Sequence, residues 1–346
     1  MHYRLVFIGF GNVGRCLARL LLRKRGLLES DYAVRFSATG IATGRHGCAV
    51  NPDGLDLVQA LELVEGGESL APLSTVPVTD TMGVLEHSSG DVMFENSPVN
   101  HATGQPAVDH VRAALELGMH AITANKGTVV HGYRELSALA AAKGRRFLFE
   151  STVLGGSPVF SVFREALPAA ELRSFKGIIN ATTNVILSRM ERGETFEQAV
   201  AFCQSVGLAE TDPSADIDGW DAAIKVAALI TVLMDAPFTP QQVEREGIRG
   251  ITAEMVKQAA AQGTRWKLVA SAERRDGKIS ARVGPERLPA SSPLYGMMDS
   301  STGLTFRTDV LPDYSIVVSE REGMPGGPEE TAYGLFADFL NAVRSH

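Results

Sequence analysis

The stretch Tyr3-Arg-Leu-Val-Phe-Ile-Gly-Phe-Gly-Asn-Val-Gly14 decides the expected fold, because it joins an apolar strand to a glycine-rich turn. A leucine-rich helix follows directly and runs to about Arg25. A lone Gly-x-Gly-x-x-Gly motif is weak evidence, but between a strand and a helix it is the fingerprint of a dinucleotide-binding unit. Gly9 makes the tight turn, Gly11 lets the backbone approach a pyrophosphate, and Gly14 lets helix and strand pack closely. The alternative is a glycine turn that serves the fold alone.

The end of the second expected strand, residues 34–42, bears on the choice of cofactor. An NAD enzyme usually has an acid there, about 20 residues past the glycines, to hold the ribose 2′-hydroxyl. This strand instead ends in Thr43-Gly-Arg-His46, and Arg45 can pair with a 2′-phosphate. The sequence therefore favours NADP and leaves NAD open. The alternative is that Arg45 is an ordinary loop residue.

The rest of the first half alternates between strands and helices. Further strands are expected over 91–96, 120–123 and 147–150, and helices over 56–64, 106–117 and 133–142, with a less regular stretch over 51–84. This alternation is typical of a doubly wound α/β sheet with helices on both faces. We expect residues 1–150 to form a Rossmann-type NAD(P)-binding domain.

The pattern changes in the second half of the chain. Strands are expected over 175–180, 267–272, 280–283, 304–308 and 314–319, and they suggest a mixed or antiparallel sheet. We therefore expect an α+β domain over 151–327 that binds substrate and carries the catalytic and dimerisation functions. The last helix, expected over 332–343, follows a glycine-rich loop, and residues 328–346 are expected to pack back onto the first domain.

An acidic stretch, Gly207-Leu-Ala-Glu-Thr-Asp-Pro-Ser-Ala-Asp-Ile-Asp-Gly-Trp-Asp-Ala-Ala-Ile-Lys225, precedes an apolar run. A helix is expected to start near Gly219 or Trp220, with Asp218 as its N-cap. Asp221 and Lys225 are then spaced i,i+4 on one face of a buried helix. A lysine at the mouth of a buried helix, facing carboxylates, is a candidate proton donor or cation site. The alternative is a solvated loop followed by a surface ion pair.

Three other segments carry polar groups at places where a site can form. Lys126 follows the strand 120–123, where it can reach an anionic substrate or the reacting carbonyl; the alternative is a surface lysine. Ala181-Thr-Thr-Asn184 can contact a polar substrate or, through Thr183 or Asn184, cap the next helix. The turn Glu150-Ser-Thr-Val-Leu-Gly-Gly-Ser-Pro158 can offer carbonyls and a carboxylate to Na⁺ or K⁺, although its spacing fits a plain domain linker better.

Composition excludes several classes of protein. The chain has 346 residues, 45% of them hydrophobic, and a formal charge of −7 with acids and bases interspersed, which does not favour nucleic acid or an anionic membrane surface. The three cysteines form no metal or disulfide pattern, so a reducing cytoplasm is expected. No apolar run is long enough for a membrane span, and the N-terminal apolar run is expected to be a strand and not a signal peptide.

Taken together, the motifs resemble those of homoserine dehydrogenase over nearly the whole chain. The glycine motif is generic, whereas the acidic stretch combined with Ala124-Asn125-Lys126 is highly specific. The motifs that carry the resemblance are Gly9-Phe-Gly-Asn-Val-Gly14, Thr123-Ala-Asn-Lys-Gly127, Glu150-Ser-Thr-Val-Leu-Gly-Gly-Ser-Pro158, Gly177-Ile-Ile-Asn-Ala-Thr-Thr-Asn184, Asp212-Pro-Ser-Ala-Asp-Ile-Asp-Gly-Trp-Asp-Ala-Ala-Ile-Lys225 and Glu329-Glu-Thr-Ala332.

The resemblance implies NAD(P)-dependent interconversion of L-homoserine and L-aspartate 4-semialdehyde, on the route to threonine and methionine, by a homodimer. It implies Lys225, Lys126 and Asp221 as catalytic residues, and Glu210, Asp216, Thr182 and Asn180 as substrate-binding residues. It places a monovalent cation (Na⁺ or K⁺) at Glu150, Val153, Gly155 and Ser157. The residues implied for the cofactor are Gly9, Gly11, Asn12, Val13, Gly14, Arg45, Asn96, Ser97, Lys126, Gly323 and Glu330.

Three departures from the family pattern qualify the resemblance. Ala181 stands where the family usually has glycine, and Leu208 stands where it often has tyrosine, so one substrate or cofactor contact is in doubt. The chain also matches the short form without the regulatory domain of longer members, so threonine feedback through such a domain is not expected. Two alternatives stay open, namely a related oxidoreductase acting on another amino acid or aldehyde, and a cofactor-sensing protein without catalysis.

Overall fold

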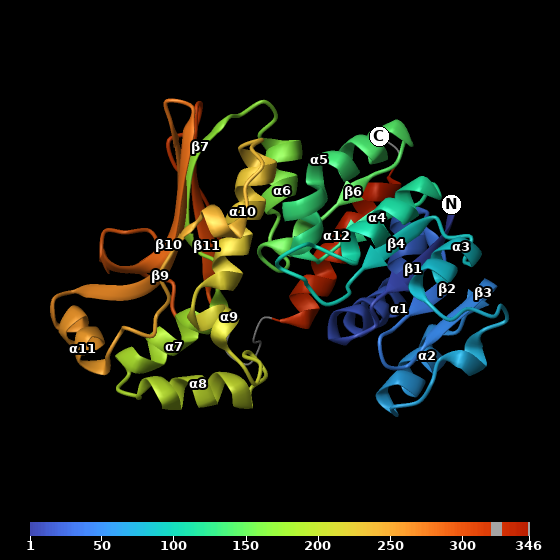
Figure 1. Ribbon diagram of the computed structural model, residues 1–346, viewed down its shortest axis with the longest axis horizontal. Coiled ribbons are helices and arrows are strands. Elements are labelled where there is room, and N and C mark those ends of the chain that lie inside the picture. Colours follow the sequence, from blue (N-terminus) through green and yellow to red (C-terminus); the bar gives the residue numbers. More distant parts are fainter. Residues whose placement is uncertain (320–326, 345–346) are drawn as a thin grey trace. The chain divides into compact units, whose positions relative to one another are not determined.

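The computed structural model describes residues 1–319 and 327–344 and divides the chain into two compact units (Figure 1). Unit 1 comprises Met1–Pro158 with Pro328–His346, and unit 2 comprises Val159–Gly327. The sequence placed the boundary at residue 150. The chain stays in unit 1 for longer because the turn after Glu150 packs against the last helix, where the Ser151 hydroxyl donates to the Thr331 carbonyl at 2.7 Å.

Unit 1 is built on a six-stranded sheet of order β3-β2-β1-β4-β5-β6. All neighbouring pairs are parallel except β2 and β3, which are antiparallel. The strand order reverses between β1 and β4, and in such sheets ligands bind outside the carboxyl ends of the strands at that point. The strands are β1 (His2–Ile8), β2 (Arg35–Ala42), β3 (Cys48–Leu55), β4 (Val92–Glu95), β5 (His120–Thr123) and β6 (Phe147–Leu148).

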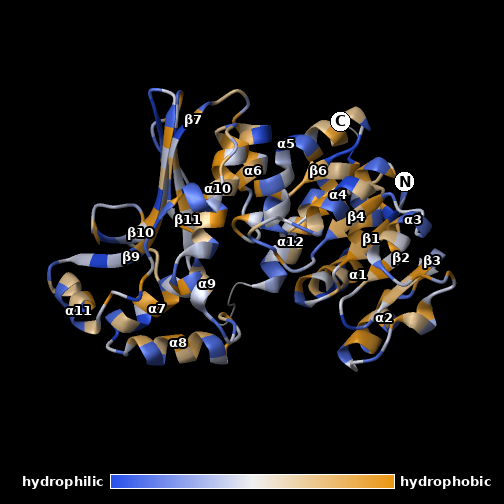
Figure 2. Cartoon of the chain, in the orientation of Figure 1, coloured by the Kyte–Doolittle hydropathy of each residue, from blue (hydrophilic) through white to orange (hydrophobic). Residues whose placement is uncertain are grey.

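Helices cover both faces of this sheet. On one face the fully buried Leu5 and Phe7 of β1 belong to a core shared with α1 and α12, and on the other Val6 packs towards α3. Figure 2 shows the resulting hydrophobic band along β1 and β4. The helices of unit 1 are α1 (Asn12–Tyr32), α2 (Leu57–Glu65), α3 (Thr81–His87), α4 (Ala107–Glu116), α5 (Lys126–Ala142) and α12 (Pro328–Val343), with short 3₁₀ turns η1 (Ala71–Leu73) and η2 (Glu150–Thr152).

Unit 2 is built on a second six-stranded sheet, of order β12-β11-β7-β9-β10-β8. All of its pairs are antiparallel except β10 with β8, so the sheet is mixed, as the sequence predicts. The strands are β7 (Leu172–Ile178), β8 (Glu244–Arg245), β9 (Thr264–Arg275), β10 (Lys278–Pro289), β11 (Thr302–Thr308) and β12 (Tyr314–Val318).

The helices of unit 2 include one that is buried almost all round. This helix, α10 (Trp220–Leu233), packs against β9 and β10, and its residues from Ala222 to Thr231 are buried apart from Lys225. The other helices are α6 (Val159–Ser161), the π-helical η3 (Val162–Ala166), α7 (Ala181–Glu191), α8 (Phe196–Ser205), α9 (Ser214–Ile217), the 3₁₀ turn η4 (Pro240–Gln242) and α11 (Ala253–Ala261).

The fold class is confirmed, and the errors of the sequence analysis are local. The antiparallel edge strand β3 lies in the stretch expected to be less regular, because its Asn51-Pro-Asp-Gly54 segment has the composition of a turn. Helix α5 begins at Lys126 and not at Tyr133, and the Asn125 side chain caps it. The early start was not predicted because the first turns of the helix contain glycines, which are unfavourable in helices. Within the described residues, none of the helices is long and apolar enough to cross a membrane.

Two predicted helix caps are wrong. Helix α10 does begin at Trp220, but its N-cap Gly219 has no side chain, and Asp218 instead ends α9 and pairs with Arg249. Helix α7 is capped by Asn180 and not by Thr183 or Asn184, because the chain turns into the helix directly after β7.

Candidate active site

The glycine turn of unit 1 follows the carboxyl end of β1, next to β4, where the strand order reverses. Gly9 has a φ of +88°, and a Cβ on it would lie 2.5 Å from the carbonyl carbon of Asn96. A Cβ on Gly14 would lie 2.5 Å from the Gly9 carbonyl oxygen. Both glycines are therefore required by contacts within the chain itself.

Gly11 has a different reason to be glycine. It caps α1, it has an ordinary φ of −76°, and a Cβ on it would meet no atom within 4 Å. Helix α1 then starts with Asn12 and Val13, has no acidic residue in its first turn, and has no side chain bonded to its N-terminal N–H groups at the cap. These N–H groups and the helix dipole suit an anion such as a pyrophosphate.

The carboxyl ends of β4 and β5 lie at the same edge of the sheet as the glycine turn. Asn96 has both side-chain polar atoms buried and without a hydrogen bond to any described residue. Ser97 donates its backbone N–H to the Glu95 carboxylate at 3.2 Å, and the Asn125 amide donates to the Ser97 carbonyl at 3.1 Å. Lys126 is the half-buried first residue of α5, directly after the Asn125 cap.

Glu95 is a further candidate residue at this edge of the sheet that was not predicted from the sequence. Its side chain is fully buried and also contacts the Nδ1 atom of His110 at 3.4 Å and the hydroxyl of Thr123 at 3.4 Å. The sequence did contain a signal for this residue, because Glu95 is a carboxylate at the end of an apolar strand, and that strand lies where the strand order reverses.

Arg45 lies in the turn that joins β2 to β3. The Thr43 N–H donates to the Gly47 carbonyl at 3.0 Å, which closes the turn and leaves Arg45 exposed. Within residues 1–319 and 327–344 the Arg45 guanidinium makes no hydrogen bond or ion pair, so it is available to an external anion.

The turn after Glu150 is held by α12. The backbone N–H of buried Glu150 donates to the Asp338 carboxylate at 2.8 Å, and Gly155 lies against Thr331. Val153 is buried, and the buried Ser157 hydroxyl has no hydrogen-bond partner among the described residues. Glu330 lies beside this turn, and burial raises the pKa of its carboxyl group. Gly323 lies outside the described residues.

In unit 2, Lys225 is held in an arrangement of buried and half-buried groups. Its ammonium donates to the Ile179 carbonyl at 2.8 Å and lies 2.7 Å from the Asp221 carboxylate. The side chains of Lys225 and Asp221 are only 14% and 16% exposed, which argues against an ordinary surface ion pair. The Ile179 carbonyl was not predicted, because a backbone oxygen has no signature in the sequence.

Asn180 connects this pair to a second carboxylate. Its side-chain amide donates to Asp216 at 2.6 Å and to Asp221 at 3.0 Å, while its oxygen caps α7 by accepting from the Thr183 N–H at 2.8 Å. Burial, and then the negative charge of Asp221, raise the pKa of Asp216. Two carboxylates this close favour a cation between or beside them. We refer to Asn180, Asp216, Asp221 and Lys225 as the lysine–carboxylate cluster.

Two predicted substrate residues lie around this cluster. The Thr182 hydroxyl donates to the Leu208 carbonyl at 3.2 Å and also bonds to Asp216. Glu210 is exposed on the loop before α9, and its carbonyl accepts from Gln204 at 3.3 Å. The structure thus brings Thr182 to the cluster, whereas no hydrogen bond or ion pair among the described residues joins the Glu210 side chain to it.

Comparison with known proteins decides the family. The homoserine dehydrogenase family model matches residues 158–340, more than half of the chain. A protein of Pseudomonas canavaninivorans named NAD(+)-dependent homoserine dehydrogenase is 33% identical over 346 residues, which cover 99% of this chain and 97% of that one. The chain belongs to the homoserine dehydrogenase family. As a homoserine dehydrogenase it is an NAD(P)-dependent oxidoreductase that acts on a small molecule.

Other homoserine dehydrogenases agree over the full length. The one from Methanocaldococcus jannaschii is 33% identical, with 99% of this chain and 98% of that one covered. A solved structure of a hyperthermophilic archaeal homoserine dehydrogenase in complex with NADPH superposes with a TM-score of 0.81 at 29% identity, covering 99% of this chain and 98% of that one. Homoserine dehydrogenases similar to this chain therefore include one named for NAD⁺ and one solved with NADPH.

Proposed function

We propose that the chain interconverts L-homoserine and L-aspartate 4-semialdehyde with NADP, on the route to threonine and methionine. The observation that carries the proposal is the lysine–carboxylate cluster, in which a half-buried ammonium is held beside two carboxylates. Such a cluster matches a substrate that has both a reacting oxygen and an ammonium group. A protein that only senses the cofactor has no need of it.

The residues of unit 1 fit a dinucleotide. The open side of Gly11 and the N-terminus of α1 suit the pyrophosphate, Arg45 suits a 2′-phosphate, and the buried unpaired amide of Asn96 suits a polar ring substituent. When bound, the nicotinamide accepts or supplies the hydride. Arg45→Ala should raise the KM for NADPH about tenfold or more and leave that for NADH within twofold, which steady-state kinetics with each cofactor would measure.

Lys225 is proposed to move the proton. In the reduction of the semialdehyde its ammonium donates a proton to the substrate oxygen, and in the oxidation of homoserine its neutral amine takes one. The contacts with Asp221 and the Ile179 carbonyl are both made by the ammonium form, so the resting enzyme is prepared for reduction. Asp216 and Asp221 are proposed to bind the substrate ammonium. Lys126 stays a proposed catalytic contact of unit 1, and Glu210 stays a proposed substrate contact.

A monovalent cation is proposed at the turn Glu150–Ser157. Val153 and Gly155 supply backbone carbonyls there, Glu150 supplies a carboxylate, and the buried Ser157 hydroxyl lacks a hydrogen-bond partner among the described residues. Oxygen ligands of this kind suit Na⁺ or K⁺. Replacing the Na⁺ and K⁺ of the assay buffer by a large organic cation should lower the activity or the melting temperature. Unchanged activity and melting temperature would contradict the proposed cation site.

A homodimer in the cytoplasm completes the proposal. A groove of about 600 Å³ lies on the sheet of unit 2, lined by charged and hydroxyl side chains that include Lys176, Glu273 and Arg282. We propose that a second copy of the chain covers this sheet surface. The three cysteines are free thiols, which suits a reducing compartment.

The test of the function is the rate of NADPH consumption with aspartate 4-semialdehyde, repeated with NADH. Rapid turnover with NADPH, and slower turnover with NADH, would support both the reaction and the role of Arg45. Folded protein that binds NADPH but turns over neither cofactor would favour another substrate or the sensing role. The sites of Leu208 and Ala181 would then be the first to compare with active relatives.

A further inference from the structure

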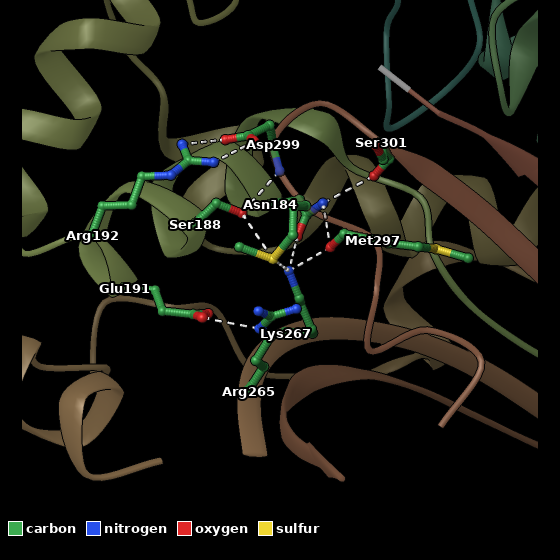
Figure 3. Close-up of polar contacts among 10 residues, drawn as sticks. Asn184, Ser188, Glu191, Arg192, Arg265, Lys267, Met297, Asp299 and Ser301 are labelled. Atoms are coloured by element: carbon green, nitrogen blue, oxygen red, sulfur yellow. Dashed lines mark hydrogen bonds and ion pairs between the residues drawn. The ribbon is translucent and has the colours of Figure 1, made fainter. Parts of the chain in front are cut away.

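Lys267 is a buried lysine in β9 that the proposed mechanism does not use. It is 1% exposed, and its ammonium donates to the Asn184 side-chain oxygen at 2.7 Å and to the Met297 carbonyl at 2.5 Å. The Met298 sulfur lies 3.5 Å away (Figure 3). All three acceptors are neutral.

The charged groups around Lys267 are paired with one another. Arg265 contacts Glu191 at 2.9 Å, and Arg192 contacts Asp299 at 2.6 Å, as Figure 3 shows. Within the part of the chain that is described, no carboxylate lies in ion-pair contact with Lys267 itself. Burial lowers the pKa of Lys267 to about 8. A methionine of similar size would fill the position at a lower cost of desolvation, so the lysine is poorly explained as core packing.

The contacts of Lys267 join three elements. Its main partner, Asn184 of α7, also donates to the Ser301 carbonyl at 2.9 Å and to the Met297 carbonyl at 3.3 Å. One turn further along α7, the Ser188 hydroxyl accepts from the Asp299 N–H at 2.9 Å. Strand β9, helix α7 and the segment before β11 are thereby fixed to each other through Lys267 and Asn184.

Asn184 lies one helical turn after Asn180, the N-cap of α7. The Asn180 amide in turn donates to both Asp216 and Asp221. A shift of α7 along its axis or about it would therefore move the Asn180 amide, which bridges the two carboxylates of the lysine–carboxylate cluster.

We propose that Lys267 is a positioning residue for the reaction, which acts through Asn184 and α7 to hold Asn180 against Asp216 and Asp221. The inference rests on the proposed function of that cluster. Lys267 is not proposed to contact the substrate or the cofactor. Its contribution is the placement of α7.

The test compares Lys267→Met with Lys257→Met, which changes an exposed lysine on α11. Lys267→Met should lower kcat/KM for aspartate 4-semialdehyde roughly tenfold to 100-fold, because small displacements of catalytic groups have effects of that size. The Kd for NADPH, measured by fluorescence, should stay close to that of the control, and the melting temperature should not fall below that of the control. A role in packing alone would instead lower the melting temperature and leave kcat per cofactor-binding molecule unchanged.

A double-variant cycle with Asn184→Ala tests the route of the effect. If both residues act through one contact, the double variant should be no slower than the slower single variant. Activity of Lys267→Met within twofold of the wild type, or losses that multiply in the double variant, would overturn the inference. If Lys267→Met does not fold, Lys267→Gln is scored by the same criteria. If the wild type and Lys225→Met are equally inactive, the proposed function itself has failed.

Discussion

At the scale of single residues, Asn180 has two roles at once. It caps α7, and its amide bridges two carboxylates that would otherwise repel each other. The i,i+4 spacing predicted that Asp221 and Lys225 would meet, and they do so at 2.7 Å. Nothing local in the sequence predicted that Asn180 would bridge Asp221 to Asp216, because the amide and Asp221 are 41 positions apart.

Lys225→Met should lower kcat for semialdehyde reduction by roughly 10²–10⁴-fold, the usual contribution of a general acid. The Kd for NADPH should not change, because Lys225 belongs to unit 2 and the glycine turn belongs to unit 1. The matched control is Lys278→Met at the exposed start of β10. A loss of less than tenfold in kcat would mean that another group supplies the proton.

The pH dependence of homoserine oxidation tests the same lysine from the other direction. In oxidation Lys225 is proposed to accept the hydroxyl proton of homoserine as a general base. We expect kcat/KM for homoserine to increase from pH 7 to pH 10 in the wild type and equally in Lys267→Met, since Lys267 is not the base. A flat profile in the wild type would contradict the role of Lys225, and a profile flattened only in Lys267→Met would assign the titration to Lys267.

Lys267 should also make stability depend on pH. Its pKa is about 8 in the folded chain, against 10.5 for an ordinary lysine, so between these values the unfolded chain holds more protons. The free energy of unfolding therefore rises with pH across this window, by about 3 kcal/mol at about 1.4 kcal/mol per pH unit. Urea denaturation of the wild type and Lys267→Met at pH 7.5 and pH 10.5 would measure it. Equal changes in both proteins would show that Lys267 titrates normally.

At the scale of elements, the turn between β1 and α1 contains glycines that are needed for two different reasons. Gly9 is required by its left-handed φ and by Asn96, whereas Gly11 is required by neither backbone conformation nor any neighbour in the chain. The sequence predicted the tight turn at Gly9 because the motif encodes a local geometry, and the positive φ confirms that turn; the approach of a pyrophosphate to Gly11 stays a prediction. The sequence assigned the capping of α7 and α10 wrongly, because the path by which the chain enters each helix depends on neighbouring elements.

Gly9→Ala should therefore change the stability of the chain, whereas Gly11→Ala should change its affinity for NADPH. Gly9→Ala should lower the free energy of unfolding by about 1–3 kcal/mol, from strain and overlap with Asn96. Gly11→Ala should unfold like the wild type but bind NADPH more weakly, by at least about tenfold, because its methyl group would occupy the side open to the pyrophosphate. Chemical denaturation and fluorescence titration measure the two quantities. Normal NADPH affinity in Gly11→Ala would place the pyrophosphate elsewhere.

At the scale of the whole molecule, the chain divides its chemistry between two units. Unit 1 has the glycine turn and Arg45, and unit 2 has the lysine–carboxylate cluster and the mixed sheet. On that sheet Arg282 lies within 3.5 Å of Glu244 and of Glu246, and 3.8 Å from Glu286. The groove beside Arg282 thus carries both positive and negative side chains. A surface with charges of both signs can pair with a second copy of itself.

Arg282→Glu should shift the proposed dimer towards monomer, because it places a fourth carboxylate among the three that Arg282 now contacts beside the groove. Arg35→Glu on β2 is the matched control, since it also reverses one member of an exposed ion pair but lies in unit 1. Sedimentation velocity over a range of protein concentrations measures the shift. A wild-type monomer, or equal dimerisation of both variants, would show that this surface is not the interface.

The sequence by itself determined the features that depend on neighbours along the chain. These are the strand–glycine–helix unit, the alternation of strands and helices in unit 1, and the i,i+4 pair of Asp221 and Lys225. Only the tertiary structure decided which distant groups meet. The Ile179 carbonyl reaches Lys225, Asn180 reaches Asp216, and a lysine in a strand is buried against α7. The physical reason is that backbone carbonyls and lone polar side chains have no periodic signature, and their partners are chosen by how the elements pack.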